Sequence, residues 1–335
     1  MLGTRVTVRG YVVGLFCIVF FVTSAEAAPH ACAHRGDSKN APENTLPALV
    51  SAVKKGAHMV EFDVQETQDG GFILMHDLFL DRTTNGSGWV GQHTLEHIRA
   101  LDAGAWFSPA FAGTKVPTLQ EALQAVPSPI LMNVHLKETV QNVAGVVQCI
   151  KDLGKDDQCV LACTPAQAEK ARSIESKIKI CNMNQGLGGK AARRAYVDDT
   201  LKRGAAFIQF FYGNGTEDIA EDIARLHAHG VQVNYYYSNE AEEMRALAEA
   251  GVDYILTDEL DLCLEVCRAF GTEPVRIDNV AKTELPALHT ARLLFSRSNG
   301  VPGAVYTRMI TLAASAPHLS LDSSDRFSFI LPFMW

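Results

Sequence analysis

Five residues near the amino-terminal end of the chain have side chains that could perform acid–base and metal-dependent chemistry. His34 and Arg35 follow a short apolar run, Glu61 and Asp63 lie two positions apart in MVEFDV, and His76 ends the run GFILMH. Imidazole titrates near neutral pH, so one histidine can accept a proton while the other donates one. Two carboxylates that face the same way repel each other unless a cation lies between them, and oxygen ligands of this kind suit calcium or magnesium.

Two basic residues add the positive charge that a phosphate group would need. The guanidinium of Arg35 can hold a phosphate through two parallel hydrogen bonds, and Lys137 follows an apolar run at 130–136. Together with the acids and the two histidines, these residues favour phosphoryl transfer of the kind that a phosphodiesterase performs. We interpret five further histidines as structural: His58, His93, His97, His227 and His229.

The composition indicates a folded globular protein rather than one that coats nucleic acid. The chain has 335 residues, of which 47% are hydrophobic and 20% charged, and its formal net charge is −8. A small anion can still bind to one local basic cluster. Seven cysteines follow residue 27, an odd number that leaves at least one thiol free. We expect most of them to be small buried hydrophobic residues, and Cys263 and Cys267 lack the additional ligands of a zinc site.

Residues 1–27 have the three parts of a secretory signal peptide. Arg5 and Arg9 precede the apolar run YVVGLFCIVFFV, and Ala25 and Ala27 form an A-x-A cleavage pattern. The run is shorter than the roughly 20 residues that a membrane-spanning helix needs. We therefore expect cleavage near Ala27 or Ala28 and a secreted or periplasmic protein without a stable membrane span; an uncleaved anchor is the alternative.

The elements that must position the chemical groups alternate between strand-like and helix-like patterns. Strands are predicted at 31–35, 59–64, 130–136, 158–162, 178–182, 205–211, 231–237 and 253–257, and helices at 45–55, 138–153, 165–175, 190–203, 217–229 and 240–250. This alternation predicts a parallel α/β barrel of the TIM type, in which the carboxyl ends of the strands carry the catalytic groups. A doubly wound open sheet is the alternative, but no glycine-rich nucleotide loop follows the first strand.

One interval departs from this alternation. Only TQDG separates MVEFDVQE from GFILMHD, which is too short for a crossover helix but sufficient for a hairpin. We therefore expect 71–76 to run antiparallel to the second strand and to bring His76 near Glu61 and Asp63. Residues 77–118 then form an insertion over the active face. The alternation ends near 270, which predicts a catalytic domain over 28–270 and an extension of unknown role over 271–335.

A series of motifs resembles one family. AHRG, APENT, EFDVQETQDG, MHD, LDRTTNGSG, ALDAGAWF, VPTLQEAL and GVDYILTDELD occur between about 31 and 265 in the order and spacing of the glycerophosphodiester phosphodiesterases. The resemblance implies a TIM barrel with a hairpin and an insertion. It also implies metal-dependent hydrolysis of small glycerophosphodiesters, such as glycerophosphocholine or glycerophosphoethanolamine, to sn-glycerol 3-phosphate and an alcohol. No protein partner is implied.

The resemblance also implies roles for individual positions. His34 and His76 match the general acid–base pair, Arg35 matches the phosphate contact, and Glu61 and Asp63 match two metal ligands. Pocket residues are implied at Glu43, Asn44 and Tyr236. In such a reaction the glycerol 2-hydroxyl attacks phosphorus to give a cyclic phosphate that water opens, and direct attack by water is the alternative.

Some residues at the site have a second interpretation or depart from the family pattern. Asn44 is also predicted to cap the helix at 45–55. NVHLK replaces the family pattern N-I-E-L-K, so His135 stands where the family has a glutamate ligand. Strand alternation puts His135 on the same face as Lys137, and neutral imidazole suits manganese or zinc better than calcium. The expected outcomes are an altered metal preference, weaker metal binding or a site without metal. Tyr236 replaces a family tryptophan and keeps an aromatic wall.

Two other functions are compatible with parts of the pattern. A related phospholipase, of the sphingomyelinase D or phosphatidylinositol-specific type, would act on membrane lipid. The chain resembles those enzymes less, because PENT and LDRTTNGSG belong to the glycerophosphodiesterase pattern. A non-catalytic binding homologue is suggested by His135 alone.

Overall fold

The structure is a computed structural model that describes residues 28–183, 188–211 and 216–277. The predicted signal peptide and residues 278–335 of the predicted extension lie outside the described residues. In the part of the chain that is described, no helix has both the length and the apolar character needed to cross a bilayer.

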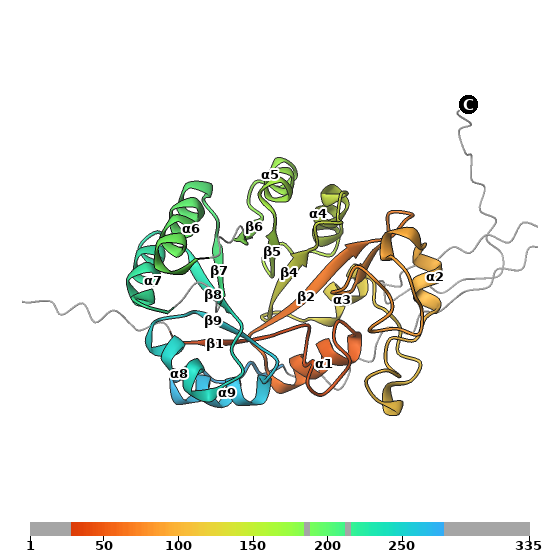
Figure 1. The fold of residues 1–335 in the computed structure, drawn as a ribbon, viewed down its shortest axis with the longest axis horizontal. Helices are drawn as coiled ribbons and strands as arrows, with labels where there is room; N and C mark the ends of the chain where they lie inside the picture. The colour runs from red at the N-terminus through yellow and green to blue at the C-terminus, as the bar shows by residue number, and fades with distance from the viewer. Residues whose placement is uncertain (1–27, 184–187, 212–215, 278–335) are drawn as a thin grey trace, which may run out of the picture. The chain divides into compact units, whose positions relative to one another are not determined.

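Within the described residues, eight parallel strands close into a barrel, which confirms the predicted fold class (Figure 1). The strand order is β1-β9-β8-β7-β6-β5-β4-β2, and pairing of β1 with β2 closes the ring. The parallel strands are β1 (His30–Ala33), β2 (Met59–Glu66), β4 (Leu131–Leu136), β5 (Cys159–Cys163), β6 (Lys179–Asn182), β7 (Phe207–Phe211), β8 (Gln232–Tyr236) and β9 (Tyr254–Thr257).

Helices follow the strands and cover the outside of the barrel (Figure 1). They are α1 (Leu46–Lys55), α3 (Leu119–Ala125), α4 (Val143–Asp152), α5 (Pro165–Ile174), α6 (Gly189–Arg203), α7 (Ile219–His227), α8 (Ala241–Glu249) and α9 (Leu260–Ala269). Several begin with the polar caps that the sequence provides. Thr118 and Thr164, for example, form capping boxes with Glu121 and Gln167 at the start of α3 and α5.

The predicted hairpin is present. Strand β3 (Phe72–Leu74) pairs antiparallel with the end of β2, with Val64 opposite Leu74. The insertion that follows contains α2 (Leu95–Ala100) and two short 3₁₀ turns at Val90–Gln92 and Pro109–Phe111. A small apolar cluster joins the insertion to the hairpin segment, and its buried members are Ile73, Met75, Leu80, Val90, Ile98, Ala103 and Val116. This packing fixes the segment that carries His76.

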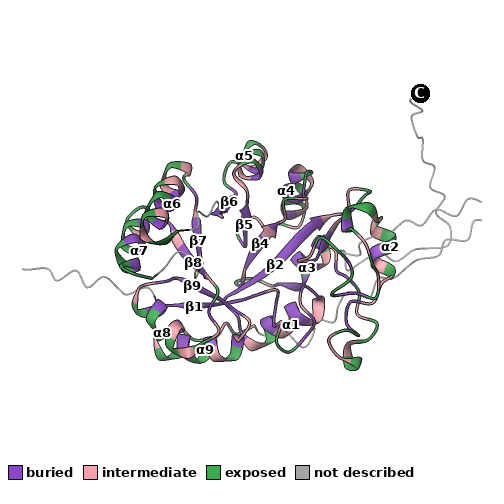
Figure 2. Cartoon of the chain, viewed as in Figure 1, coloured by how far each residue is buried: buried purple, intermediate pink, exposed green. Residues whose placement is uncertain are grey.

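The two faces of β2 have different roles. Val60, Phe62 and Val64 are fully buried in the main core. Figure 2 shows the strand that carries them, β2, coloured as buried. Burial of each such side chain stabilises the fold by about 1.5–3 kcal/mol. The intervening residues point into the barrel, where Met59 joins a smaller apolar cluster. The outward face therefore supplies the stability, which leaves the inward positions of Glu61 and Asp63 available for chemistry.

The cysteines behave as buried hydrophobic residues. All seven in the described part of the chain are free, and six of them are buried, whereas Cys149 is half-buried. Burial raises the pKa of Cys159 and of Cys163 to about 12, so both remain protonated thiols at neutral pH.

The first residues of the predicted extension continue the packing of the barrel. The amide of Val275 donates to the carbonyl of Gly56 at 2.9 Å, and His58 Nε2 lies 3.0 Å from the carbonyl oxygen of Glu273. Gly56 has a φ of +85°, and a Cβ atom there would lie 2.6 Å from the carbonyl oxygen of Val275. The turn after α1 therefore requires glycine, and the packing of the barrel continues through residue 277.

Candidate active site

The acidic pair lies inside the barrel at the carboxyl end of β2. Glu61 is 4% exposed and Asp63 is 1% exposed. The register of β2 and β4 places Asp63 opposite His135. His135 Nδ1 lies 2.8 Å from Asp63 Oδ1 and 3.8 Å from Glu61 Oε1. One ligand atom from each of these residues lies within 4.8 Å of the other two, so the three side chains form a candidate metal centre.

Asp63 is surrounded by groups that stabilise its negative charge. Asn44 Nδ2 donates to Oδ2 at 2.9 Å, and Lys137 Nζ lies 3.0 Å from Oδ1. Burial raises the pKa of Asp63, but the hydrogen bond from His135 and the charges of His135 and Lys137 outweigh this effect and hold it well below its usual value. Burial and the charge of Asp63 raise the pKa of Glu61. A cation near Glu61 would offset that repulsion.

Asn44 holds Asp63 in place rather than capping a helix. Its amide donates to Asp63 Oδ2, and its Oδ1 accepts from the backbone amide of Asp63 at 3.0 Å. Thr45 occupies the cap position of α1 and makes no side-chain capping bond. The predicted cap was wrong because the amide of Asn44 is committed to Asp63, with the backbone at a φ of +55° that asparagine tolerates.

His34 is held by a carboxylate from near the carboxyl-terminal end of the domain's sequence. Its Nδ1 lies 2.8 Å from Asp258 Oδ1, directly after β9, because β1 and β9 pair with Ala33 opposite Thr257. Burial lowers the pKa of His34, but the hydrogen bond to Asp258 and the charge of Glu61 outweigh burial and raise it overall. Burial raises the pKa of Asp258, whereas the bond from His34 and other donors bring it down to about 2.

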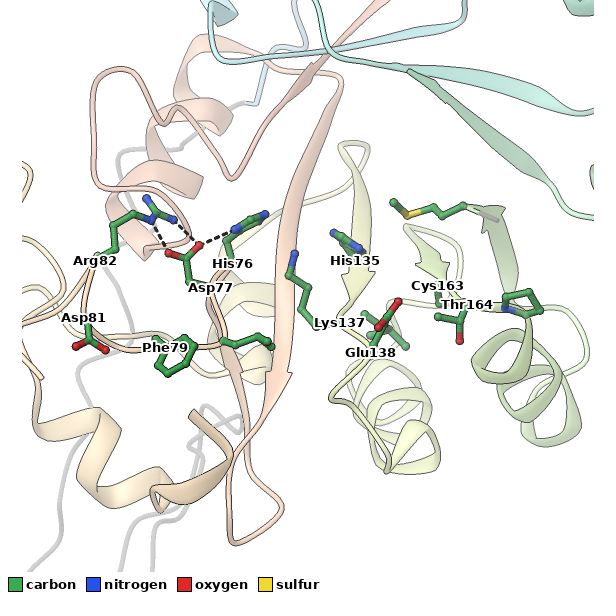
Figure 3. A pocket seen from close by; sticks show the side chains of 14 residues that line it. His76, Asp77, Phe79, Asp81, Arg82, His135, Lys137, Glu138, Cys163 and Thr164 are labelled. Atoms are coloured by element: carbon green, nitrogen blue, oxygen red, sulfur yellow. Dashed lines mark hydrogen bonds and ion pairs between the residues drawn. The ribbon is translucent and has the colours of Figure 1, made fainter. Parts of the chain in front are cut away.

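His76 is held in a similar way by its neighbour in the sequence. Its Nδ1 lies 2.7 Å from Asp77 Oδ1. Asp77 has a pKa below its usual value, chiefly because of its hydrogen bonds from Arg82, and is therefore an acceptor. Nδ1 accordingly carries the proton. Nε2 lies on the side of the ring away from Asp77 and has no hydrogen-bond partner among the described residues (Figure 3). Burial is the largest influence on the pKa of His76, which is lowered overall.

Arg35 lies between the acidic pair and Glu43. Its backbone amide donates to Glu61 Oε2 at 2.9 Å, and its Nη1 donates to Glu43 Oε1 at 2.8 Å. The backbone has a φ of +56° at Arg35 and +81° at Gly36. A Cβ atom at Gly36 would lie 2.6 Å from the backbone of Ala48 in α1, so the turn that presents His34 and Arg35 depends on this glycine.

A cavity of about 890 Å³ opens beside the candidate metal centre (Figure 3). Of the predicted site residues, His76, His135 and Lys137 line it. Leu78 and Phe79 of the insertion and Met183 after β6 add apolar wall. Tyr236 lies against His34, with ring centroids 5.4 Å apart. All the predicted site residues therefore belong to one neighbourhood at the carboxyl ends of the strands, and His135 of the cavity wall contacts the acidic pair.

Sequence reasoning did not single out three residues that contact the histidines or their partners: Asp77, Arg82 and Asp258. Each lies inside one of the family motifs. Asp258 directly follows the last predicted strand, and in a closed barrel that strand neighbours the first. That adjacency is the signal that could have predicted its contact with His34.

A closed parallel barrel with a buried cluster of acids and imidazoles at the carboxyl ends of its strands defines a TIM-barrel enzyme with a candidate metal centre. The chain belongs to the glycerophosphoryl diester phosphodiesterase family, whose model matches residues 34–262. It is therefore a phosphodiesterase of the hydrolase class.

Relatives with known names match most of the domain. A glycerophosphodiester phosphodiesterase of Caldanaerobacter subterraneus is 32% identical over 245 residues, which are 71% of this chain and 98% of the relative. One of Bacillus subtilis is 30% identical over 292 residues, covering 78% and 97%.

Solved structures show the same fold. A glycerophosphodiester phosphodiesterase from Agrobacterium tumefaciens has a TM-score of 0.61 and 27% identity, covering 70% of this chain and 98% of its own. A phosphodiesterase from Oleispira antarctica, in complex with the product sn-glycerol-3-phosphate, has a TM-score of 0.65 and 24% identity, covering 72% and 97%.

Proposed function

We propose that the protein hydrolyses small glycerophosphodiesters, such as glycerophosphocholine or glycerophosphoethanolamine, to sn-glycerol 3-phosphate and an alcohol. The observation that carries this proposal is the arrangement of two imidazoles around one acidic pair. The charge of Glu61 acts on His34 and that of Asp63 acts on His76, and each ring is oriented by a carboxylate at Nδ1. The product named for the Oleispira phosphodiesterase is consistent with this chemistry.

The different surroundings of the two histidines suggest different roles. His76 has a lowered pKa and a free Nε2, so it is suited to accept the proton of the attacking hydroxyl. His34 has a raised pKa and is suited to protonate the oxygen of the leaving alcohol as the P–O bond breaks. Attack by the glycerol 2-hydroxyl gives a cyclic phosphate that water then opens, and direct attack by water would use the same two groups.

Two cationic side chains are available to stabilise the phosphate. Lys137 lines the cavity, and Arg35 lies beside the acidic pair with its orientation fixed by Glu43. Their charges would balance the negative charge that develops on the phosphate oxygens in the transition state. We propose that Tyr236, next to His34, forms a wall for the alcohol group.

The residues present fit a divalent cation. Two carboxylates are nearly fully buried, and with His135 they offer ligand atoms that all lie within 4.8 Å of one another. We infer that Glu61, Asp63 and His135 hold the ion. When bound, it would polarise the attacking hydroxyl and offset negative charge on the phosphate. A nitrogen ligand in place of a family carboxylate favours manganese or zinc over calcium or magnesium.

We also propose that the protein is exported. Support comes from the sequence of residues 1–27, with two arginines, an apolar run and an A-x-A pattern. Mass spectrometry of the protein recovered from its native host tests this proposal, because cleavage near Ala27 would give a new amino terminus there.

The catalytic proposal is tested by a glycerol 3-phosphate assay on purified protein. The protein is stripped with a chelator and then supplied separately with calcium, magnesium, manganese or zinc. We expect glycerol 3-phosphate to be released from glycerophosphocholine with at least one ion, and the His34→Ala/His76→Ala double variant serves as the control. Phosphocholine as the product would contradict the proposed bond cleavage. Binding of glycerophosphocholine without turnover under every ion would instead identify a binding homologue.

A further inference from the structure

One guanidinium from the insertion joins two sides of the candidate active site. Arg82 donates to Asp77 through Nε at 2.6 Å and through Nη2 at 2.9 Å. The same group donates to Glu43 through Nη1 at 2.7 Å and through Nη2 at 2.8 Å. Both contacts use two hydrogen bonds, which fixes the plane of each carboxylate as well as its position.

Each of these carboxylates also holds a side chain to which the proposed reaction assigns a role. Asp77 Oδ1 accepts from His76 Nδ1, and Glu43 Oε1 accepts from Arg35 Nη1 at 2.8 Å. A continuous series of contacts therefore runs from Arg35 through Glu43, Arg82 and Asp77 to His76. Figure 3 shows the part of this series from Arg82 to His76.

We propose that Arg82 is a positioning residue that sets the orientation of both His76 and Arg35 toward the substrate phosphate. This inference rests on the proposed function, because His76 and Arg35 have their roles in that reaction. Arg82 occupies Oδ2 of Asp77 and shares Oδ1, so the carboxylate presents Oδ1 to His76 Nδ1. The ring then has one tautomer, and its Nε2 is held away from Asp77.

Simultaneous contact with Asp77 and Glu43 requires the planar guanidinium of an arginine at position 82. A guanidinium offers five N–H donors in one plane and can contact two carboxylates at once, whereas an ammonium is a point charge without that planarity. Lysine at position 82 could thus pair with Asp77 or with Glu43, but would not align both.

Because the side chain of Arg82 is exposed, a positioning role and a structural role predict different effects of its substitution. Its side chain is 43% exposed, and ion pairs at exposed positions add little to the stability of a fold. Substitution of Arg82 should therefore affect catalysis much more than thermal stability. The insertion provides a matched control in Arg99, which donates to Glu121 Oε1 and to the carbonyl of Val116, both at 2.6 Å. These contacts of Arg99 involve neither histidine of the proposed pair.

The experiment compares Arg82→Ala, Arg82→Lys and Arg99→Ala in the full chain with the metal that supports wild-type turnover. Misplacement of a reacting group by about 1 Å can cost about 10²-fold in rate. We expect Arg82→Ala to lose about that factor in kcat/KM, Arg82→Lys to be intermediate, and Arg99→Ala to match the wild type. Millimolar guanidinium should restore part of the activity of Arg82→Ala and leave Arg99→Ala unchanged.

A measurement that does not depend on turnover accompanies the kinetics. The ¹⁵N chemical shifts of the His76 ring should show a single Nδ1–H tautomer in the wild type and a mixture in Arg82→Ala. Folded Arg82→Ala with wild-type kcat/KM and an unchanged tautomer would overturn the proposal, as would equal losses in Arg82→Ala and Arg99→Ala. If the wild type released no glycerol 3-phosphate, the proposed function would fail, whereas the tautomer comparison would still show whether Arg82 orients His76.

Discussion

His135 Nδ1 lies 2.8 Å from Asp63 Oδ1, its register partner on the neighbouring strand. An imidazole at this position adds no negative charge to a site that already contains two buried acids. The apo protein is thereby spared a third mutually repelling carboxylate, and the proposed preference for manganese or zinc rests on this nitrogen ligand.

His135→Glu should shift the metal preference of the site from zinc toward calcium. We expect the affinity for calcium, relative to that for zinc, to rise at least tenfold, which corresponds to about 1.4 kcal/mol. Isothermal titration of the chelator-stripped protein with each ion measures this ratio directly. The variant should also melt at a lower temperature without metal, because a third acid at this half-buried position would repel the two buried ones. If the ratio of affinities did not change, His135 would not be a ligand.

Substitution of either proposed acid–base residue should lower the rate of the chemical step. We expect His34→Ala and His76→Ala each to reduce kcat by about 10²- to 10⁴-fold, the usual contribution of such a group. Single-turnover kinetics with glycerophosphocholine measure the effect. His229→Ala is the control, because this exposed ring lies in the turn after α7, where it contacts the carbonyl oxygen of Arg225 and none of the proposed site residues. A comparable loss in that control would argue against a specific role for the pair.

Asp258→Asn should change how activity depends on pH. Asp258 raises the pKa of His34 through its hydrogen bond and its charge, so an amide in its place lowers that pKa. A general acid works only while protonated, and activity therefore falls as pH rises through its pKa. The alkaline limb of the kcat profile should consequently move to lower pH in the variant. An unchanged limb would mean that His34 is not the acid, and a shift to higher pH would contradict the stabilising effect of Asp258 on the protonated ring.

The buried ion pair between α6 and α7 should contribute to the free energy of unfolding without affecting the candidate active site. Arg193 is fully buried, and its Nε donates to Asp222 Oδ2 at 2.7 Å. Arg193→Met leaves a buried carboxylate without this partner and should lower the free energy of unfolding by about 3–5 kcal/mol. Urea unfolding measures the change. Lys151→Met, which removes an ion pair of the surface with Glu175, should leave the urea midpoint nearly unchanged. Equal effects of the two substitutions would show that burial does not determine how much an ion pair contributes to the free energy of unfolding.

The sequence predicted the barrel well because its signals are local. Each predicted strand overlaps an observed one, since an apolar run bounded by polar turns requires no knowledge of its neighbours. The hairpin followed from chain length alone, because TQDG cannot cross a sheet. The short helix and turns of the insertion were not predicted. Their buried apolar residues are few, and Val90 and Ile98 pack with Ile73 and Met75 of the hairpin segment in a cluster separate from the main core.

The sequence indicated which residues lie together at the candidate site, but it did not indicate their hydrogen bonds. Alternation along β2 was sufficient to place Glu61 and Asp63 on one face. The partner of His34 is 224 positions away in the chain, and only the ring of strands brings it close. The error at Asn44 has a similar origin, because a polar residue before a helix can bond to the helix or to a distant strand, and the backbone turn decides which.

The pairing of β1 with β9 has a consequence for the protein during its synthesis. His34 is made early in synthesis, but Asp258, which orients it, arrives more than two hundred residues later. A nascent or prematurely terminated polypeptide thus contains both imidazoles and both acids and still lacks the contact that holds one ring in place. The ring of His34 therefore gains this orientation only when the last strand pairs with the first and closes the barrel.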